Sequence, residues 1–262
     1  MIAISDNLQI RKDSPSGTIV INRPNRRNAL SREIVAALKQ AFEDFYQEGT
    51  VQAVILTGSG TTFCAGTDLQ ELKESLESPD SIEIWQDDAN QFLDLIEYML
   101  RYPKPIICGV NGCMVGSGAA LALASDIVVA DHDAKMMMPE ARLGLFSGIS
   151  AALLPHRIGA GHAARIMMTA ASVDATEGLN LGIFHEIVDN ELMWARCHEI
   201  AVQIASGAKQ SQILIKQMLN ETVGEELFTQ LCIGAANTAT ARTTEAAAEG
   251  ITAYLEKREP KW

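Results

Sequence analysis

The sequence lacks the features that mark secreted and membrane-spanning proteins. Its 262 residues include five cysteines, an odd number, and no two of them form a C-x-x-C pair. No apolar run reaches the ~18 residues needed to cross a bilayer. The first residues show no basic segment followed by an apolar one, as a secretory signal would. We therefore expect a cytoplasmic protein whose cysteines are reduced and mostly buried.

Positive charge is also scarce. The chain has 21 lysines and arginines against 33 aspartates and glutamates, which gives a net charge of −12. A field of this sign repels nucleic acids and anionic membranes, so we expect neither as a partner. An anionic ligand would need a local basic patch. The acids concentrate between Asp68 and Glu97, where Lys73 is the only base, and this pattern predicts a solvent-facing helical surface.

Three common catalytic motifs are missing. The chain has no G-K-[ST], and the segment GSGAAL at 116–121 has Leu121 where a dinucleotide-binding loop has its third glycine. The five histidines show no ligand spacing and no H-E-x-x-H, so no metal site is predicted. No G-x-S-x-G is present, which argues against a serine hydrolase.

Apolar periodicity is present throughout, and it changes near residue 148. Before this point, strand-like runs alternate with helical segments, and Ser31 is a predicted helix N-cap. The expected strands are 18–22, 51–58, 105–110 and 126–131, and the segment 134–145 is expected to form a short strand and a turn. After it, helices are expected at 150–170, 174–181, 190–205, 209–220, 223–238 and 242–256, with one strand at 185–189. The pattern predicts an α/β half followed by a helical part.

Two glycine-bearing turns, FCAGTDL at 63–69 and VGSGAAL at 115–121, each lie between an apolar strand and a helix. The first N–H groups of a helix are unpaired and lie at the positive end of its dipole. Two such turns directed at one point would form an oxyanion hole, whereas two ordinary tight turns are the alternative.

One glutamate lies in an unusual setting. Glu140 follows a run of methionines and a proline in MMMPEARLGL, residues 136–145. A carboxyl beside apolar side chains can have a raised pKa and can move protons near neutral pH. An exposed turn glutamate is the alternative.

Five segments, in chain order, resemble the motifs of the crotonase, or enoyl-CoA hydratase/isomerase, superfamily. They are INRPNRRNALS (21–31), VILTGSGTTFCAGTDL (54–69), KPIICGVNGCMVGSGAALALASDIVVA (104–130), PEARLGLFSGISAALLPHRIG (139–159) and EGITAYLEKREPKW (249–262). The resemblance implies an α/β fold, a ClpP-like spiral of ββα units. Residues 1–195 would form the spiral core with an acyl-CoA site. Residues 196–262 would form a helical region that assembles a homotrimer or a dimer of trimers.

The resemblance also implies a function. Members of this family bind acyl-CoA thioesters and stabilise a thioester enolate with two backbone N–H groups, which here would be those of Thr67 and Ser117. Ser117 stands where glycine is usual, and its Cβ could tighten or tilt the turn. Coenzyme A is part of the substrate, and no other cofactor is expected. The implied contacts with coenzyme A are Arg23, Arg27, Ala65, Asp68, Leu69, Tyr254 and Lys257.

The chain departs from the hydratase pattern at one decisive position. Ala120 stands where hydratases have the first of two glutamates, while Glu140 matches the second. Gly148 stands where dienoyl-CoA isomerases have an aspartate, which disfavours that subfamily. A single carboxylate can move a proton from one carbon to another, so we expect a Δ3-Δ2-enoyl-CoA isomerase. The alternatives are an enoyl-CoA hydratase or lyase, an acyl-CoA decarboxylase or carbon–carbon hydrolase, and a non-catalytic binding protein.

Overall fold

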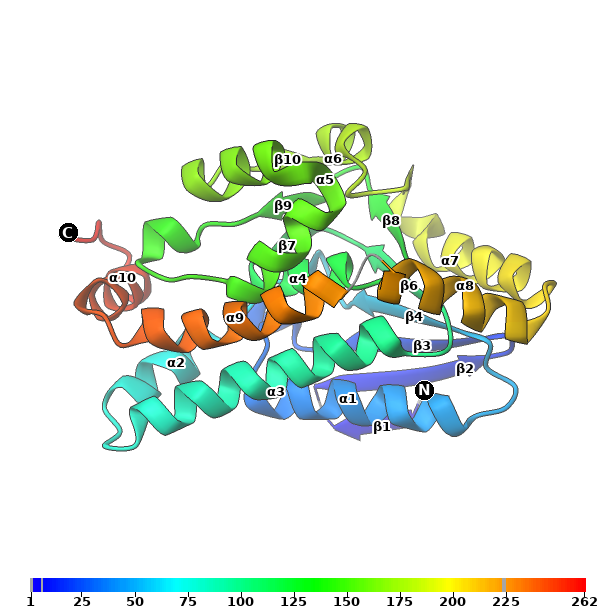
Figure 1. Cartoon of the computed structure of the whole chain (residues 1–262), viewed down its shortest axis with the longest axis horizontal. Helices are drawn as coiled ribbons and strands as arrows, with labels where there is room; N and C mark the ends of the chain where they lie inside the picture. Colours follow the sequence, from blue (N-terminus) through cyan, green and yellow to red (C-terminus); the bar gives the residue numbers. More distant parts are fainter. Residues whose placement is uncertain (1, 6, 223–224) are drawn as a thin grey trace.

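The computed structural model describes residues 2–5, 7–222 and 225–262 of the chain. Within these ranges two β-sheets frame the fold (Figure 1). The larger sheet has the strand order β1-β2-β3-β4-β6-β8-β11, and the smaller has the order β10-β9-β7-β5. The larger sheet consists of β1 (Ile2–Ser5), β2 (Leu8–Asp13), β3 (Ser16–Ile21), β4 (Ala53–Gly58), β6 (Ile106–Val110), β8 (Ile127–Asp131) and β11 (Glu186–Val188). The smaller sheet consists of β5 (Thr62–Cys64), β7 (Cys113–Val115), β9 (Lys135–Met137) and β10 (Val173–Asp174).

A ββα unit occurs three times along the chain. In each unit one strand joins the parallel part of the larger sheet, the next strand joins the smaller sheet, and a helical segment follows. The first unit is β4, β5, α2 (Leu69–Leu76) and α3 (Ser81–Arg101). The second is β6, β7 and α4 (Ser117–Leu123), and the third is β8, β9, the 3-10 turn η2 (Glu140–Leu143) and α5 (Gly148–Thr169). The carboxyl ends of β5, β7 and β9 therefore lie side by side at one edge of the smaller sheet.

The remaining helices surround this spiral. They are η1 (Pro24–Arg26), α1 (Arg32–Gln47), α6 (Ala175–Leu181), α7 (Asn190–Ala205), α8 (Lys209–Thr222), α9 (Glu225–Arg242) and α10 (Glu245–Leu255). In Figure 1, α9 runs alongside α3 and crosses the end of α5, and both pairs of helices are packed together. The helix α10 returns to pack against α2 and η2. These contacts bring the C-terminal helices to the same edge as the turns that follow β5, β7 and β9.

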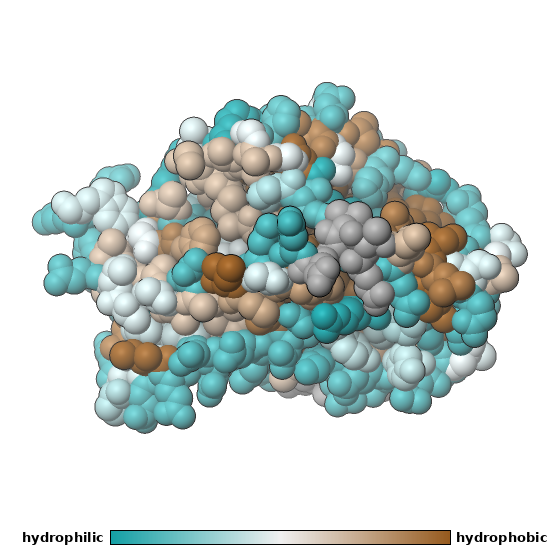
Figure 2. All heavy atoms as spheres, in the orientation of Figure 1, coloured by the Kyte–Doolittle hydropathy of each residue, from teal (hydrophilic) through white to brown (hydrophobic). Residues whose placement is uncertain are grey.

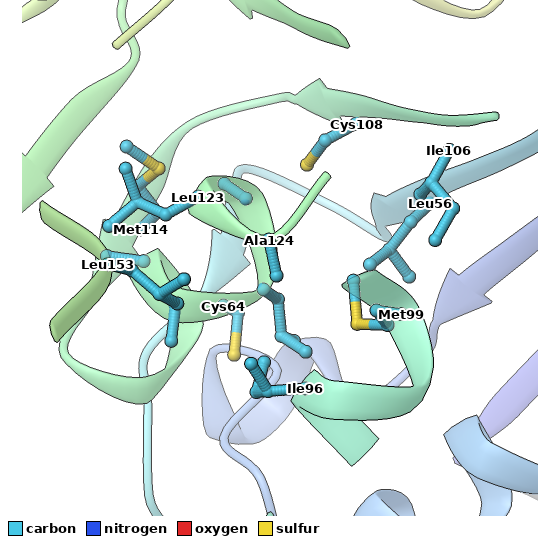
Figure 3. Close-up of a cluster of buried hydrophobic side chains, with 14 of the residues drawn as sticks. Leu56, Cys64, Ile96, Met99, Ile106, Cys108, Met114, Leu123, Ala124 and Leu153 are labelled. Atoms are coloured by element: carbon cyan, nitrogen blue, oxygen red, sulfur yellow. The ribbon is translucent and has the colours of Figure 1, made fainter. Parts of the chain in front are cut away.

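The small residues of α4 are explained by close packing. All six residues from Gly118 to Leu123 are buried. A Cβ on Gly118 would lie 2.5 Å from the carbonyl oxygen of Cys64, so only glycine lets α4 approach the end of β5. Figure 3 shows Leu123 and Ala124, at the end of this helix, among Ile96 and Met99 of α3 and the cysteine side chains of the strands. The small residues of this segment therefore allow α4 to pack closely in the core.

Most predicted elements are confirmed by the structure. The four expected N-terminal strands correspond to β3, β4, β6 and β8, and the strand at 185–189 corresponds to β11. The six expected C-terminal helices correspond to α5 to α10, although residues 223 and 224 lie outside the described ranges. Ser31 caps α1 as predicted, because its hydroxyl oxygen accepts a hydrogen bond from the N–H of Ile34 at 3.3 Å. The division at 195/196 falls within α7 and stays a prediction.

The strands that the sequence did not predict have a common physical cause. β5, β7 and β10 are two or three residues long, too short to show an alternating pattern. The β1–β2 hairpin is antiparallel at the edge of the larger sheet, and most of the described side chains of β2 are only partly buried or exposed. A strand whose side chains are only partly buried shows little alternation of apolar and polar residues, so the sequence did not reveal it.

The structure also bears on the cysteines and on membranes. All five cysteines are free, and three of them, Cys64, Cys108 and Cys197, are buried. In the ranges 2–5, 7–222 and 225–262, no helix combines the length and the apolarity that a membrane crossing requires.

Candidate functional site

A cavity opens where the turns after β5, β7 and β9 meet helices α1, α2, α3 and α9. Its lining includes both glycine-bearing turns, the start of η2 and residues from all four helices. Thr67, Ser117 and Glu140, the three predicted catalytic residues, all line it. The ββα repeat therefore brings together segments that lie more than seventy residues apart in the sequence.

The first turn, residues 65–68, is held by the loop before α1. The N–H of Ala65 donates to the carbonyl oxygen of Arg27 at 3.0 Å, and that of Leu30 donates to Gly66 O at 2.7 Å. The N–H of Asp68 donates to Leu30 O at 3.0 Å. This parallel bridge leaves the N–H of Thr67, between them, without an acceptor among the described residues. Thr67 therefore presents a free backbone donor from a fixed position.

The second turn reaches the same place from β7. Gly116 has φ 51° and ψ −115°, a conformation that favours glycine, and it precedes the first helical residue, Ser117. Because Ser117 opens α4, its N–H has no acceptor within the helix. The Oγ1 of Thr67 lies 3.0 Å from the Oγ of Ser117, within hydrogen-bonding distance. A Cβ on Gly66 would lie 2.6 Å from Val115 O, so the two turns are in direct contact.

Glu140 lies against the second turn. It follows Pro139 and opens η2, whose end is fixed by Gly144 with φ 61°. A Cβ on Gly116 would lie only 2.2 Å from Glu140 Oε1, so the carboxyl occupies the space above that glycine. Burial raises the pKa of the Glu140 carboxyl to about 7, although a backbone hydrogen bond opposes the shift. The group can therefore both accept and release a proton near neutral pH.

The other carboxyls of the cavity are already paired. Asp68 caps α2 through a 2.9 Å bond from Gln70 N–H and forms an ion pair with Arg23. Burial alone would raise the pKa of Asp68, but these hydrogen bonds and the charge of Arg23 hold it below its ordinary value. Glu71 accepts from the N–H of Arg32 at 3.1 Å, and two arginines pair with Asp88. Among the described residues of the cavity, Glu140 is the carboxyl whose hydrogen bonding is limited to its own backbone, whereas Asp68 and Asp88 pair with arginines and Glu71 accepts from the N–H of another segment.

Ala120 and Gly148, the two positions at which the chain differs from related subfamilies, are both closely packed. Ala120 is completely buried among the residues of α4 and is not part of the cavity lining in the described chain. A Cβ on Gly148 would lie 1.9 Å from the carbonyl oxygen of Gly234. The backbone of α9 therefore fills the space that an aspartate at position 148 would need.

The predicted contacts with coenzyme A fall into two groups. Ala65, Asp68, Leu69 and Tyr254 line the cavity. Arg23, Arg27 and Lys257 are not part of its lining; Arg23 is paired with Asp68, and the other two side chains are exposed. The assignments of these residues to coenzyme A stay predictions.

The sequence interpretation missed one polar feature of the cavity. The acidic segment from Asp68 to Glu97 was expected to face solvent, and most acids of α3 do. For Asp88 the expectation was wrong, because its side chain is only 15% exposed and lines the cavity with Arg32 and Arg242. Asp88 precedes Phe92 by one helical turn, so its position on the inner face was the signal that could have identified it.

These observations define a class of protein. Its ββα units form a spiral in which two backbone N–H groups share a cavity with one partly buried carboxyl that has no side-chain partner among the described residues. Donors in this arrangement can stabilise negative charge on an oxygen, and the adjacent carboxyl can move a proton.

Comparisons with known proteins place the chain in a family. A sequence model of the enoyl-CoA hydratase/isomerase family matches residues 14–262. The chain is 30% identical over 246 residues to the 1,2-epoxyphenylacetyl-CoA isomerase of Escherichia coli, covering 94% of each chain. It is 33% identical to a putative enoyl-CoA hydratase of Thermus thermophilus, covering 93% of this chain and 96% of that one.

A solved structure agrees with this placement. The crystal structure of an enoyl-CoA hydratase/isomerase from Pseudoalteromonas atlantica superposes with a TM-score of 0.85 at 30% identity, over 98% of this chain and 99% of that one. The chain therefore belongs to the enoyl-CoA hydratase/isomerase family, the crotonase superfamily. This confirms the predicted fold class and the kind of enzyme family.

Proposed function

We propose that this protein is a Δ3-Δ2-enoyl-CoA isomerase that uses Glu140 as its single acid and base. The observation that carries the proposal is the state of the cavity carboxyls. In the described chain Glu140 has no side-chain partner and lies partly buried beside the N–H groups of Thr67 and Ser117, whereas Asp68, Glu71 and Asp88 are engaged by other segments. One free carboxyl suits a proton shift, because the proton that it removes is the proton that it returns.

The reaction begins with a 3-enoyl thioester whose carbonyl oxygen accepts hydrogen bonds from Thr67 N–H and Ser117 N–H. The Glu140 carboxylate removes a proton from C2, and the electron pair of that C–H bond moves toward the carbonyl. The negative charge of the resulting dienolate rests on the oxygen that the two N–H groups hold. Glu140, now protonated, returns the proton to C4. The double bond then lies between C2 and C3, and the carboxyl is ionised again.

Hydration of a 2-enoyl thioester is the second candidate. The names of two relatives favour it: a short-chain-enoyl-CoA hydratase of Clostridium acetobutylicum is 30% identical over 260 residues, and the Thermus relative is a putative hydratase. Hydration needs a water held and deprotonated while a carbon is protonated. Ala120 supplies no second carboxyl for this task, which favours the isomerase.

The proposal includes the assembly and the ligand. A homotrimer or a dimer of trimers is supported by exposed apolar side chains on α8, namely Leu214, Ile215, Met218 and Leu219. Figure 2 shows hydrophobic residues gathered at the right-hand end of the molecule, where Figure 1 places α8. Coenzyme A enters as part of the substrate, and no further cofactor is proposed. Free cysteines support a cytoplasmic location.

Isotope transfer tests the mechanism. Trans-3-hexenoyl-CoA with deuterium at C2 should be converted to the conjugated 2-enoyl thioester, with part of the deuterium recovered at C4. A single shuttling carboxyl predicts this transfer, whereas hydration adds the mass of a water molecule to a 2-enoyl substrate. Glu140→Gln should lower kcat by at least about 100-fold. Glu83→Gln, on the exposed side of α3, is the matched control and should match the wild type.

Other outcomes identify other functions. Hydration of trans-2-hexenoyl-CoA without isomerase activity would support the hydratase. Carbon dioxide release or carbon–carbon cleavage with other acyl-CoA esters would support a decarboxylase or a hydrolase. Thioester binding with no turnover would support a non-catalytic binding protein. Full isomerase activity in Glu140→Gln would contradict the proposed mechanism.

A further inference from the structure

A charged cluster forms part of the cavity wall and is not used by the proposed reaction. It consists of Arg32 at the start of α1, Asp88 on α3 and Arg242 at the end of α9. Arg32 Nε lies 2.6 Å from Asp88 Oδ1, and Arg32 Nη2 lies 3.0 Å from Oδ2. Arg242 Nη1 donates to the same Oδ2 at 3.3 Å. No hydrogen bond among the described residues joins this cluster to Thr67, Ser117 or Glu140.

The cluster continues the side-chain rows that line the cavity. On α3, Asp88 lies one turn from Phe92, and on α9, Arg242 lies one turn from Thr238. Val35 follows Arg32 at the same kind of interval on α1. Each of the three helices thus contributes one charged side chain and at least one uncharged side chain to the same wall. A ligand that fills the cavity contacts both kinds.

Arg242 has unused hydrogen-bonding capacity. Its side chain is only 8% exposed, and its one hydrogen bond to the described residues is the long contact with Asp88. A guanidinium group carries five N–H donors, and burying a charge without partners costs free energy. Asp88 is also shared with Arg32, whose two shorter bonds hold both carboxylate oxygens. Burial lowers the pKa of Arg242, the charge of Asp88 opposes this, and the charge of Arg32 adds to it.

The neighbouring charges leave room for another acceptor. Glu71 faces the cluster from α2 through its bond with Arg32 N–H, and Glu74 of the same helix acts on Arg32 through its charge. Neither makes a hydrogen bond with the side chain of Arg242 in the described chain. The charges that act on Arg242 itself are those of Asp88 and Arg32, which sum to zero. An oxygen acceptor of a ligand, whether ionised or neutral, can therefore approach Arg242 without meeting an excess of negative charge.

We propose that Arg242 binds an oxygen of the acyl group other than the thioester oxygen, so that the substrate class is an oxygenated acyl-CoA rather than a plain hydrocarbon thioester. This inference rests on the proposed acyl-CoA function of the same cavity. The two backbone N–H groups hold the thioester oxygen, and the arginine donates hydrogen bonds to a carboxylate, ketone or hydroxyl farther along the acyl group. Asp88 orients Arg242 and competes with the ligand for its donors.

Binding of saturated thioesters tests the inference without any turnover. Calorimetric dissociation constants would be measured for pentanoyl-CoA, 4-oxopentanoyl-CoA and glutaryl-CoA, which share a five-carbon acyl group. The six- and eight-carbon counterparts would test whether a longer acyl group is needed for its oxygen to reach Arg242. At one of these lengths at least, the wild type should bind an oxygenated thioester about tenfold or more tightly than the alkyl thioester. Comparing the ketone with the carboxylate shows which oxygen is preferred.

Two variants should shift this preference in opposite directions. Arg242→Met should abolish the preference, and Arg242→Lys should retain part of it. Asp88→Asn, which weakens the competing acceptor, should increase the preference for the carboxylate several-fold. Arg165→Met removes an exposed ion pair with Glu177 on α5 and α6 and serves as the matched control. Thermal unfolding of each variant checks that the fold is retained.

The possible failures are distinguishable. If no thioester binds, the proposed acyl-CoA function fails and this inference fails with it. If all thioesters bind but the wild type shows no oxygen preference at any length, only this inference is wrong. If Arg242→Met weakens alkyl and oxygenated thioesters equally, the arginine serves the coenzyme A part and the inference is also wrong.

Discussion

The two walls of the cavity are built in different ways. One wall consists of backbone: the turns at 65–68 and 115–118 present N–H groups, and glycines let the turns touch. Another part of the lining consists of side chains from α1, α3 and α9, and it includes the Arg32–Asp88–Arg242 cluster. Backbone donors depend on the fold and tolerate many side chains, whereas a side-chain wall changes with every substitution. We expect chemistry to reside in the first wall and substrate choice in the second.

The largest effect is expected from adding one methyl group to the backbone wall. In Gly116→Ala the new Cβ would lie 2.2 Å from Glu140 Oε1, and alanine is strained at φ 51°. The carboxyl must move, so kcat should fall by about 100-fold or more, because misplacing a catalytic group by about 1 Å has an effect of that size. Steady-state kinetics with trans-3-hexenoyl-CoA measures the loss. Gly161→Ala, on α5 with open space around its Cβ position, is the control. Equal kcat in the two variants would contradict the placement of Glu140.

The next largest effect is a pH dependence of the rate that comes from Glu140, the carboxyl that lies against the backbone wall at Gly116. Glu140 must be ionised to remove the C2 proton, and burial holds its pKa at about 7. The value of kcat/KM should therefore fall about tenfold for each pH unit below 7 and level off above it. A pH profile of kcat/KM checks this. A flat profile between pH 5 and 8 would show that another group acts as the base.

The same carboxyl should make the free energy of unfolding depend on pH. The pKa of Glu140 is about 7 in the fold and near 4.5 in the unfolded chain, so the folded protein binds a proton between these values that the unfolded chain does not. This stabilisation is complete below about pH 4.5 and is lost as the pH rises through 7. It amounts to about 3 kcal/mol. Denaturant unfolding of wild type and Glu140→Gln at several pH values measures the difference, which should vanish if Glu140 is solvated.

The contrast between the walls also explains what the sequence could predict. The glycine turns, Ser31 and the C-terminal helices depend on local rules of conformation, capping and periodicity, and the structure agrees with them. Thr67, Ser117 and Glu140 could be located through the resemblance of their motifs. Asp88 and Arg242 could not be paired from the sequence, because 154 residues separate them and only the packing of α9 on α3 brings them together.

The side-chain wall can be perturbed with less effect on chemistry. Asp88→Ala removes the partner of two arginines and leaves Arg242 buried without its hydrogen bond. The free energy of unfolding should fall by about 2 kcal/mol, because an unpaired buried charge keeps its desolvation cost. Asp94→Ala, on an exposed part of α3, should change it little. Denaturant unfolding measures both. In Asp88→Ala the apparent pKa read from the pH profile of kcat/KM should stay near 7. A shift of that pKa would mean that the two walls are coupled.

The smallest effect is expected where the two kinds of construction meet, at Ser117. Its N–H belongs to the backbone wall, and its hydroxyl lies 3.0 Å from that of Thr67. Ser117→Gly keeps the N–H and removes the hydroxyl pair, so kcat should change by no more than about fivefold, the value of one exchanged neutral hydrogen bond. Ser117→Pro removes the N–H itself and should cost about 100-fold in kcat, as loss of an oxyanion donor does. Similar losses in the two variants would mean that the hydroxyl, and not the backbone donor, stabilises the developing charge.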